Sequence, residues 1–156
     1  MSAEPFVDTN IWVYAHTEAP GDLRGPLARS LVEDGRRFVI STQVLSEYYS
    51  AMLKNGATDS LIQQNIESMI LRCELRLIVL SVIRLAHRVR NRFGFSYWDS
   101  LVVASALEAG CDILFSEDLQ HDQRIERSLR VVNPFVIASR SNNSEDVGTT
   151  PPAHDQ

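Results

Sequence analysis

The sequence predicts an α/β fold, a three-layer α/β/α sandwich in which helices cover both faces of a mostly parallel central sheet. Short apolar runs alternate with longer segments of helical periodicity along most of the chain. One run, residues 77–80, is continuously apolar, as expected of a strand buried on both faces. With 156 residues, the chain has the length of one domain. We assign residues 1–138 to that domain and the polar residues 139–156 to a disordered C-terminal tail.

The first half of the chain is expected to hold two strands and three helices. The first strand covers residues 4–7, and the second, over residues 37–40, contains β-branched residues. A helix over residues 22–33 tolerates a proline in its first turn and ends before a glycine. Ser41 or Thr42 is expected to cap a helix that runs through residue 54 and ends at an Asn-Gly pair. A further helix over residues 58–73 has apolar residues at helical spacing.

The second half is expected to hold three strands and two helices. The strands cover residues 77–80, 112–115 and 129–132. Ser81 is expected to cap a helix that runs to residue 93 and buries the stripe Val82, Leu85, Val89 and Phe93. The last helix begins at residue 96, runs to residue 108 and closes at a glycine.

Composition limits the cell compartment and the kinds of partner. The two cysteines, Cys73 and Cys111, are far apart, and we expect buried free thiols that suit a reducing cytoplasm. No run is long enough to span a bilayer, and the N-terminus lacks the pattern of a signal peptide, so we expect a cytoplasmic protein with no membrane partner. The net charge of −5 falls to −3 without the tail, which neither supports nor excludes RNA.

Four carboxylates are expected to converge at one edge of the sheet. Asp8 directly follows the first strand, and Asp118 follows the strand over residues 112–115. Glu47 and Asp99 lie in the first two turns of helices expected to begin at that same edge. Like charges this close are costly unless a cation offsets them, and a set of oxygen ligands suits Mg²⁺ or Mn²⁺. The sequence therefore predicts an acidic metal-binding pocket.

Each of these acids also has a purely structural explanation. Asp8 begins an Asp-Thr-Asn segment that could cap the next helix. Ser96-x-x-Asp99 matches a capping box. Glu47 could be a solvated helix residue, and Asp118 a turn residue. The prediction therefore depends on the joint placement of the acids.

Four stretches of the chain resemble the motifs of PIN-domain proteins, in particular the VapC-type toxins of bacterial toxin–antitoxin pairs. They are FVDTNI at residues 6–11, STQVLSE at 41–47, YWDSLVVAS at 97–105 and ILFSEDL at 113–119, in the order of the family. The similarity covers about residues 4–135, nearly the whole predicted domain.

The resemblance implies an endoribonuclease that uses Mg²⁺ or Mn²⁺ to hydrolyse RNA phosphodiester bonds. It also implies a homodimer and a cognate antitoxin as partners. The acidic positions of the family fall on Asp8, Glu47, Asp99 and Asp118, which we expect to be the catalytic metal ligands. Thr9, Asn10 and Ser116 are expected to orient ligands or water, although the family more often has Thr at the last position. Glu117 or Asp122 could supply the late acid in place of Asp118.

A basic stripe is the candidate surface for the RNA backbone. Arg84, Arg88 and Arg92 recur every fourth residue of one predicted helix, and an aromatic segment over residues 93–98 follows and could stack a base. The alternative is a solvated helix face beside core aromatics.

Rival functions remain open at this point. A phosphoaspartyl phosphatase needs a second Asp two residues after the first, where this chain has Asn10, and a phosphoacceptor domain needs a late Lys, whereas the only lysine is Lys54. Two stronger alternatives are a non-catalytic PIN-like module that binds RNA or protein, and an RNA-processing or structure-specific nuclease outside toxin–antitoxin systems.

Overall fold

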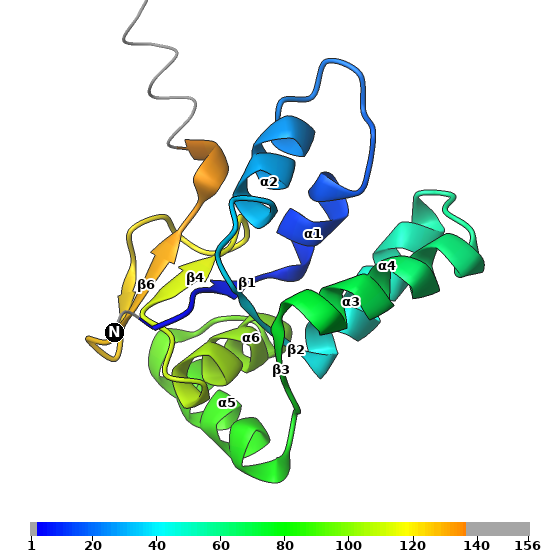
Figure 1. Ribbon diagram of the computed structural model, residues 1–156. Helices are drawn as coiled ribbons and strands as arrows, with labels where there is room; N and C mark the ends of the chain where they lie inside the picture. Colours follow the sequence, from blue (N-terminus) through cyan, green and yellow to red (C-terminus); the bar gives the residue numbers. More distant parts are fainter. Residues whose placement is uncertain (1–2, 137–156) are drawn as a thin grey trace, which may run out of the picture.

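A single six-stranded sheet organises the computed structural model, which describes residues 3–136 (Figure 1). The strands are β1 (Phe6–Val7), β2 (Val39–Ser41), β3 (Glu74–Arg76), β4 (Ile113–Phe115), β5 (Arg124–Ile125) and β6 (Leu129–Val132). They lie in the order β3-β2-β1-β4-β6-β5, and all neighbours are parallel except β5 and β6. The prediction of an α/β fold with a mostly parallel sheet is confirmed.

Helices lie on both sides of this sheet. They are α1 (Thr9–Ala15), α2 (Arg24–Val32), α3 (Thr42–Lys54), α4 (Asp59–Arg72), α5 (Leu80–Phe93) and α6 (Tyr97–Glu108). Figure 1 shows α1 and α2 on one side and α5 and α6 on the other. Contacts link α1 to both α2 and α3, and α5 packs along α6. The three layers of the predicted sandwich are therefore present.

Side-chain caps fix the starts of α1, α3 and α6. Asp8 caps α1, since its Oδ1 accepts a hydrogen bond from the Thr9 N–H at 2.7 Å. Of the two residues expected to cap α3, Ser41 is the cap, and Ser96 caps α6 by accepting from the Asp99 N–H at 3.1 Å. The predicted cap at Ser81 is wrong, because the N-cap of α5 is Val79, two residues earlier, and the helix begins at Leu80.

The core surrounds the central strands. Phe6 and Val7 of β1, Ile40 of β2 and Leu114 of β4 are all fully buried, as expected of parallel strands covered on both faces. The predicted stripe of α5 is also confirmed, with Val82 and Val89 buried and with Leu85 and Phe93 packed against the core. Cys73 and Cys111 are buried free thiols, as predicted.

The predicted strand over residues 77–80 is wrong. The observed strand, β3, ends at Arg76, which pairs with Ser41 at the last position of β2. Beyond this point β2 has become α3, so no backbone partner remains, and the Ile78 N–H donates instead to Thr42 Oγ1 at 3.1 Å. Leu77 and Leu80 are 62% and 59% exposed. The apolar run therefore forms a surface loop and the start of α5.

Two elements were not predicted. α1 has seven residues and β5 has two, too few for a periodic pattern to emerge. The predicted tail, residues 139–156, lies outside the described residues. Among the helices of residues 3–136, none has the length and apolar character needed to cross a membrane.

Candidate metal-binding site

Asp8 lies at the carboxyl end of β1, beside the end of β4. Its backbone N–H donates to Phe115 O at 2.9 Å, which joins the two strand ends. One carboxylate oxygen accepts from the Thr9 N–H, and the other accepts from Ser116 Oγ at 2.8 Å. Asp8 is 4% exposed, and Ser116 is fully buried. The carboxyl group is thus held in one orientation by hydrogen bonds from two segments that are distant in sequence.

The surroundings of Asp8 disfavour its negative charge. Burial is the largest cause that raises its pKa, from 3.8 to about 7, and the negative charges of Asp118 and Glu47 raise it further. The hydrogen bonds from Ser116 and Thr9 act in the opposite direction. A buried carboxyl near two other acids is an environment in which a bound cation would stabilise the charged form.

Asp118 approaches Asp8 from the segment that follows β4. Its backbone N–H donates to Ser116 Oγ at 3.2 Å, so this hydroxyl connects the two acids. Asn10 Nδ2 lies 2.9 Å from both carboxylate oxygens of Asp118. Partial burial raises the pKa of Asp118, and the negative charge of Asp99, at the start of α6, raises it further. Asp99 therefore belongs to the same electrostatic cluster.

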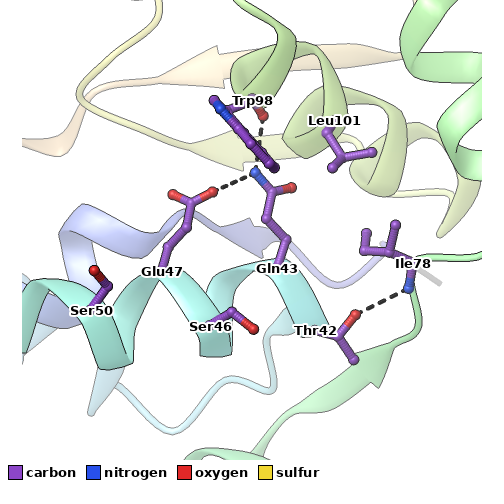
Figure 2. A pocket seen from close by; sticks show the side chains of 8 residues that line it. All are labelled: Thr42, Gln43, Ser46, Glu47, Ser50, Ile78, Trp98 and Leu101. Carbon is purple, nitrogen blue, oxygen red and sulfur yellow. Dashed lines mark hydrogen bonds between the residues drawn. The ribbon is translucent and has the colours of Figure 1, made fainter.

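Glu47 faces this cluster from α3. Its Oε2 lies 3.5 Å from Thr9 Oγ1, and its Oε1 accepts from Gln43 Nε2 at 2.5 Å (Figure 2). The same amide nitrogen donates to the backbone oxygen of Trp98 at 3.1 Å. Gln43 thus links α3 to the first turn of α6, one residue before Asp99. The structure brings together the four acids that the sequence singled out.

The two alternative late acids have other partners. Glu117 accepts a hydrogen bond from Tyr14 Oη at 2.7 Å and pairs with Arg24 at 3.3 Å. Burial and then the bond to Glu117 raise the pKa of Tyr14 to about 12. Asp122 is exposed and lies 3.4 Å from an Arg130 nitrogen. These contacts favour Asp118 as the late acid of the cluster.

The predicted basic stripe lies on α5. Arg84 and Arg88 are exposed, whereas Arg92 forms a hydrogen-bonded ion pair with Glu126 at 2.8 Å. Glu126 lies in the turn that precedes β6, and β6 runs parallel to β4, so this turn is at the edge of the sheet opposite to Asp8. Arg92 is therefore remote from the acidic cluster.

The carboxylates offer the donor chemistry of a hard divalent cation, but they do not form a closed set of ligands. Within residues 3–136, no three His, Cys, Asp or Glu side chains are arranged to hold a metal ion directly. Mg²⁺ usually retains several waters and binds through one or two carboxylates, which this arrangement permits. The donor set and the raised pKa of Asp8 fit such an ion.

Sequence reasoning missed two groups that position the acids. Gln43 lies four residues before Glu47 on α3, and this spacing on a helix was the one available signal. The contacts that Tyr14 and Arg24 make with Glu117 join α1, α2 and the segment after β4. Such contacts between distant segments leave no pattern in the sequence.

Comparison with known proteins identifies the family. The family model of the PIN domain matches residues 6–126 of this chain. A crystal structure of Mycobacterium tuberculosis VapC20, described as a sarcin–ricin loop cleaving toxin, is 19% identical, with a TM-score of 0.60 over 74% of this chain and 92% of that chain. A toxin–antitoxin complex from Klebsiella pneumoniae is 16% identical, with a TM-score of 0.64 over 85% of this chain and 98% of that chain. A comparison with curated proteins found no match to this chain. At these identities the solved structures show a shared fold, and the match over residues 6–126 shows that the chain belongs to the PIN-domain family.

Proposed function

We propose that this chain is an Mg²⁺- or Mn²⁺-dependent endoribonuclease that hydrolyses RNA phosphodiester bonds. The observation that carries the proposal is the acidic cluster around the buried Asp8 carboxyl, which is close enough to Asp118 and Glu47 for their charges to raise its pKa. Crowded acids at the carboxyl ends of parallel strands are costly for folding and useful for binding a cation. Membership of the PIN-domain family supports the same assignment.

In the proposed mechanism, Asp8 and Asp99 would hold the metal, Glu47 would bind it directly or through water, and Asp118 would complete a second site. A bound metal would act as a Lewis acid toward the phosphate and would lower the pKa of the water that it binds.

The neighbouring polar groups keep these acids in place. Thr9 and Ser116 orient Asp8, and Asn10 holds Asp118. Gln43 holds Glu47. Such hydrogen bonds to ligand carboxylates fix their orientation before the substrate arrives.

We further propose that the chain is the toxin of a toxin–antitoxin pair, acting as a homodimer in the cytoplasm. The similarity in fold to a toxin–antitoxin complex and to a sarcin–ricin loop cleaving toxin supports this. Co-purification of a small protein partner that suppresses cleavage would distinguish this role from that of an RNA-processing nuclease.

The decisive experiment compares the cleavage of a mixed tRNA and rRNA pool in Mn²⁺ by the wild type, Asp99→Asn and Asp112→Asn. Asp112 is exposed and precedes β4, at the edge of the sheet opposite to Asp8, so it is a matched control. We expect the wild type and Asp112→Asn to cleave RNA, and EDTA to stop all cleavage. Asp99→Asn should lose at least about 100-fold in rate, as is common when a general acid, base or metal ligand is removed. Equal cleavage by all three proteins would refute the site, and no cleavage of any RNA would favour the binding-module alternative.

A further inference from the structure

A groove of about 580 Å³ opens beside Glu47, between α3 and the start of α6 (Figure 2). Ser46, Glu47 and Ser50 line it from α3, and Ile78, Trp98 and Leu101 face them. Its volume is within the range of small-molecule sites. Because Glu47 belongs both to this groove and to the acidic cluster, a molecule in the groove would lie next to the proposed metal site.

Trp98 contributes an aromatic ring to the lining of the groove. Trp98 is 61% exposed, whereas its aromatic neighbours in sequence are packed. Phe93 and Phe95 stack on each other with ring centroids 5.5 Å apart and lie against the core. Tyr97 packs against α5 and supports the Trp98 ring edge-to-face at 5.2 Å. An exposed indole, held from one side, is a typical platform for an unpaired base.

Gln43 provides a second and independent feature of the groove. It is 7% exposed, and its Oε1 is a buried acceptor with no hydrogen-bond partner among the described residues. The orientation of the amide is fixed because its nitrogen serves two acceptors, Glu47 Oε1 and Trp98 O. Figure 2 shows Oε1 on the side of the groove toward Leu101, away from Glu47. A buried acceptor without a donor is costly, so a ligand with an N–H group would relieve this cost.

We propose that this groove binds one nucleobase of an RNA strand held at the acidic site, with Trp98 stacking on the base and Gln43 Oε1 accepting a hydrogen bond from it. Every nucleobase has an N–H donor on its Watson–Crick edge. Because Oε1 is buried, side chains that line the groove must move aside for the base to reach it. The inference rests on the proposed ribonuclease function and adds a base-binding subsite to it.

The charges around the groove favour a base over a phosphate. The described residues that line it include an acid, Glu47, and no basic side chain. A phosphate would be repelled here, whereas an uncharged base with its polar edge toward Gln43, Ser46 and Ser50 would not. The phosphate next to that base would instead face the proposed metal site.

Two-dimensional NMR of ¹⁵N-labelled protein tests the inference directly, because the chain has two tryptophans and therefore two indole N–H signals. Trp12 is 3% exposed and its Nε1 donates to Val7 O at 3.3 Å, so its signal is an internal control. The probe is a single-stranded RNA tetranucleotide containing all four bases, added to the Asp99→Asn chain in Mg²⁺ so that the RNA stays intact. The matched ligand without bases is an abasic ribose-phosphate tetramer.

We expect the tetranucleotide, and not the abasic tetramer, to shift the Trp98 indole and Gln43 amide signals. Introducing Trp98→Ala should weaken RNA binding at least about fivefold, the lower end of what base–aromatic stacking contributes. Trp98→Phe, which keeps a flat ring, should retain most of the affinity. Leu71→Ala is the matched control, since Leu71 is 87% exposed on α4 and does not line the groove.

The outcomes separate this inference from the proposed function. If RNA shifts signals around Asp8 and leaves Trp98 and Gln43 unchanged, the base subsite is wrong and the nuclease proposal stands. If Trp98 responds to RNA while the wild type cleaves no RNA, the subsite stands and the nuclease proposal fails. If the Trp98 signal follows protein concentration and ignores RNA, a second copy of the chain occupies the groove, and the inference is overturned.

Discussion

At the scale of single residues, Asp8 has two roles that place opposite demands on its carboxyl group. As the cap of α1 it accepts the Thr9 N–H, a bond that favours the charged form. As the most buried acid of the cluster it is desolvated, which disfavours that form and raises its pKa to about 7. The second effect outweighs the first. In the metal-free protein, the proposed catalytic acid therefore lowers the stability of the fold at neutral and alkaline pH.

This balance predicts that Asp8→Asn stabilises the metal-free protein. The folded-state pKa of Asp8 is raised above the ordinary value of 3.8. The contribution of Asp8 to the stability of the fold is thus fully present below about pH 4 and is lost as the pH rises through about 7. Asn keeps the cap and cannot ionise. In EDTA at pH 8 we expect its melting temperature to exceed that of the wild type by at least about 3 °C, roughly 1 kcal/mol in a chain of this length.

Thermal unfolding at pH 4 and pH 8 provides the check. At pH 4 the two proteins should melt together, because Asp8 is then protonated. The Asp112→Asn control, at an exposed position, should match the wild type at both values. A melting temperature for Asp8→Asn below that of the wild type at pH 8 would show that the charged form is favoured in the fold.

At the scale of elements, the segment after β4 separates two adjacent acids into different roles. Glu117 points to Tyr14 and Arg24 and joins this segment to α1 and α2. Asp118, one residue later, meets Asn10 and the acidic cluster. The buried Ser116 hydroxyl fixes the start of the segment through Asp8.

We therefore predict a split between two variants that differ by one position. Asp118→Asn should lower the rate of RNA cleavage at least about tenfold, because a ligand carboxylate is lost. Glu117→Gln should keep at least half of the rate and lower stability by about 1 kcal/mol or less, since its ion pair with Arg24 is half-exposed. Cleavage rates and denaturant melts of the two variants test this. The reverse order of rates would make Glu117 the late acid.

Particular elements also show which parts of the fold and of the site the sequence alone could predict. Strand ends and helix caps placed Asp8, Glu47, Asp99 and Asp118 at one edge, because caps and apolar runs are local signals. The run over residues 77–80 was wrongly predicted as a strand, because an apolar stretch on the rim of a groove has the same composition as a buried strand. The four-residue spacing of Gln43 and Glu47 on α3 is a local signal, whereas the contact of Gln43 with Trp98 depends on how α3 meets α6, which no local pattern encodes.

At the scale of the whole molecule, folding and metal binding are expected to be coupled. The acidic cluster draws its side chains from the ends of β1 and β4 and the starts of α3 and α6. A cation bound there would offset the repulsion among these elements and would stabilise the folded state over the unfolded chain. The unfavourable charge of Asp8 in the metal-free protein would become a favourable one.

The last prediction follows from this coupling and uses no catalytic readout. At about 100 times its dissociation constant, a bound ion adds about 2.7 kcal/mol, which corresponds to roughly 5–10 °C in melting temperature here. We expect Mn²⁺ to raise the melting temperature of the wild type and of Asp112→Asn by this amount, and EDTA to reverse the rise. Asp8→Asn should start higher in EDTA and gain little from Mn²⁺, so that the order of the melting temperatures inverts. An equal gain in all three proteins would place the bound ion outside the acidic cluster.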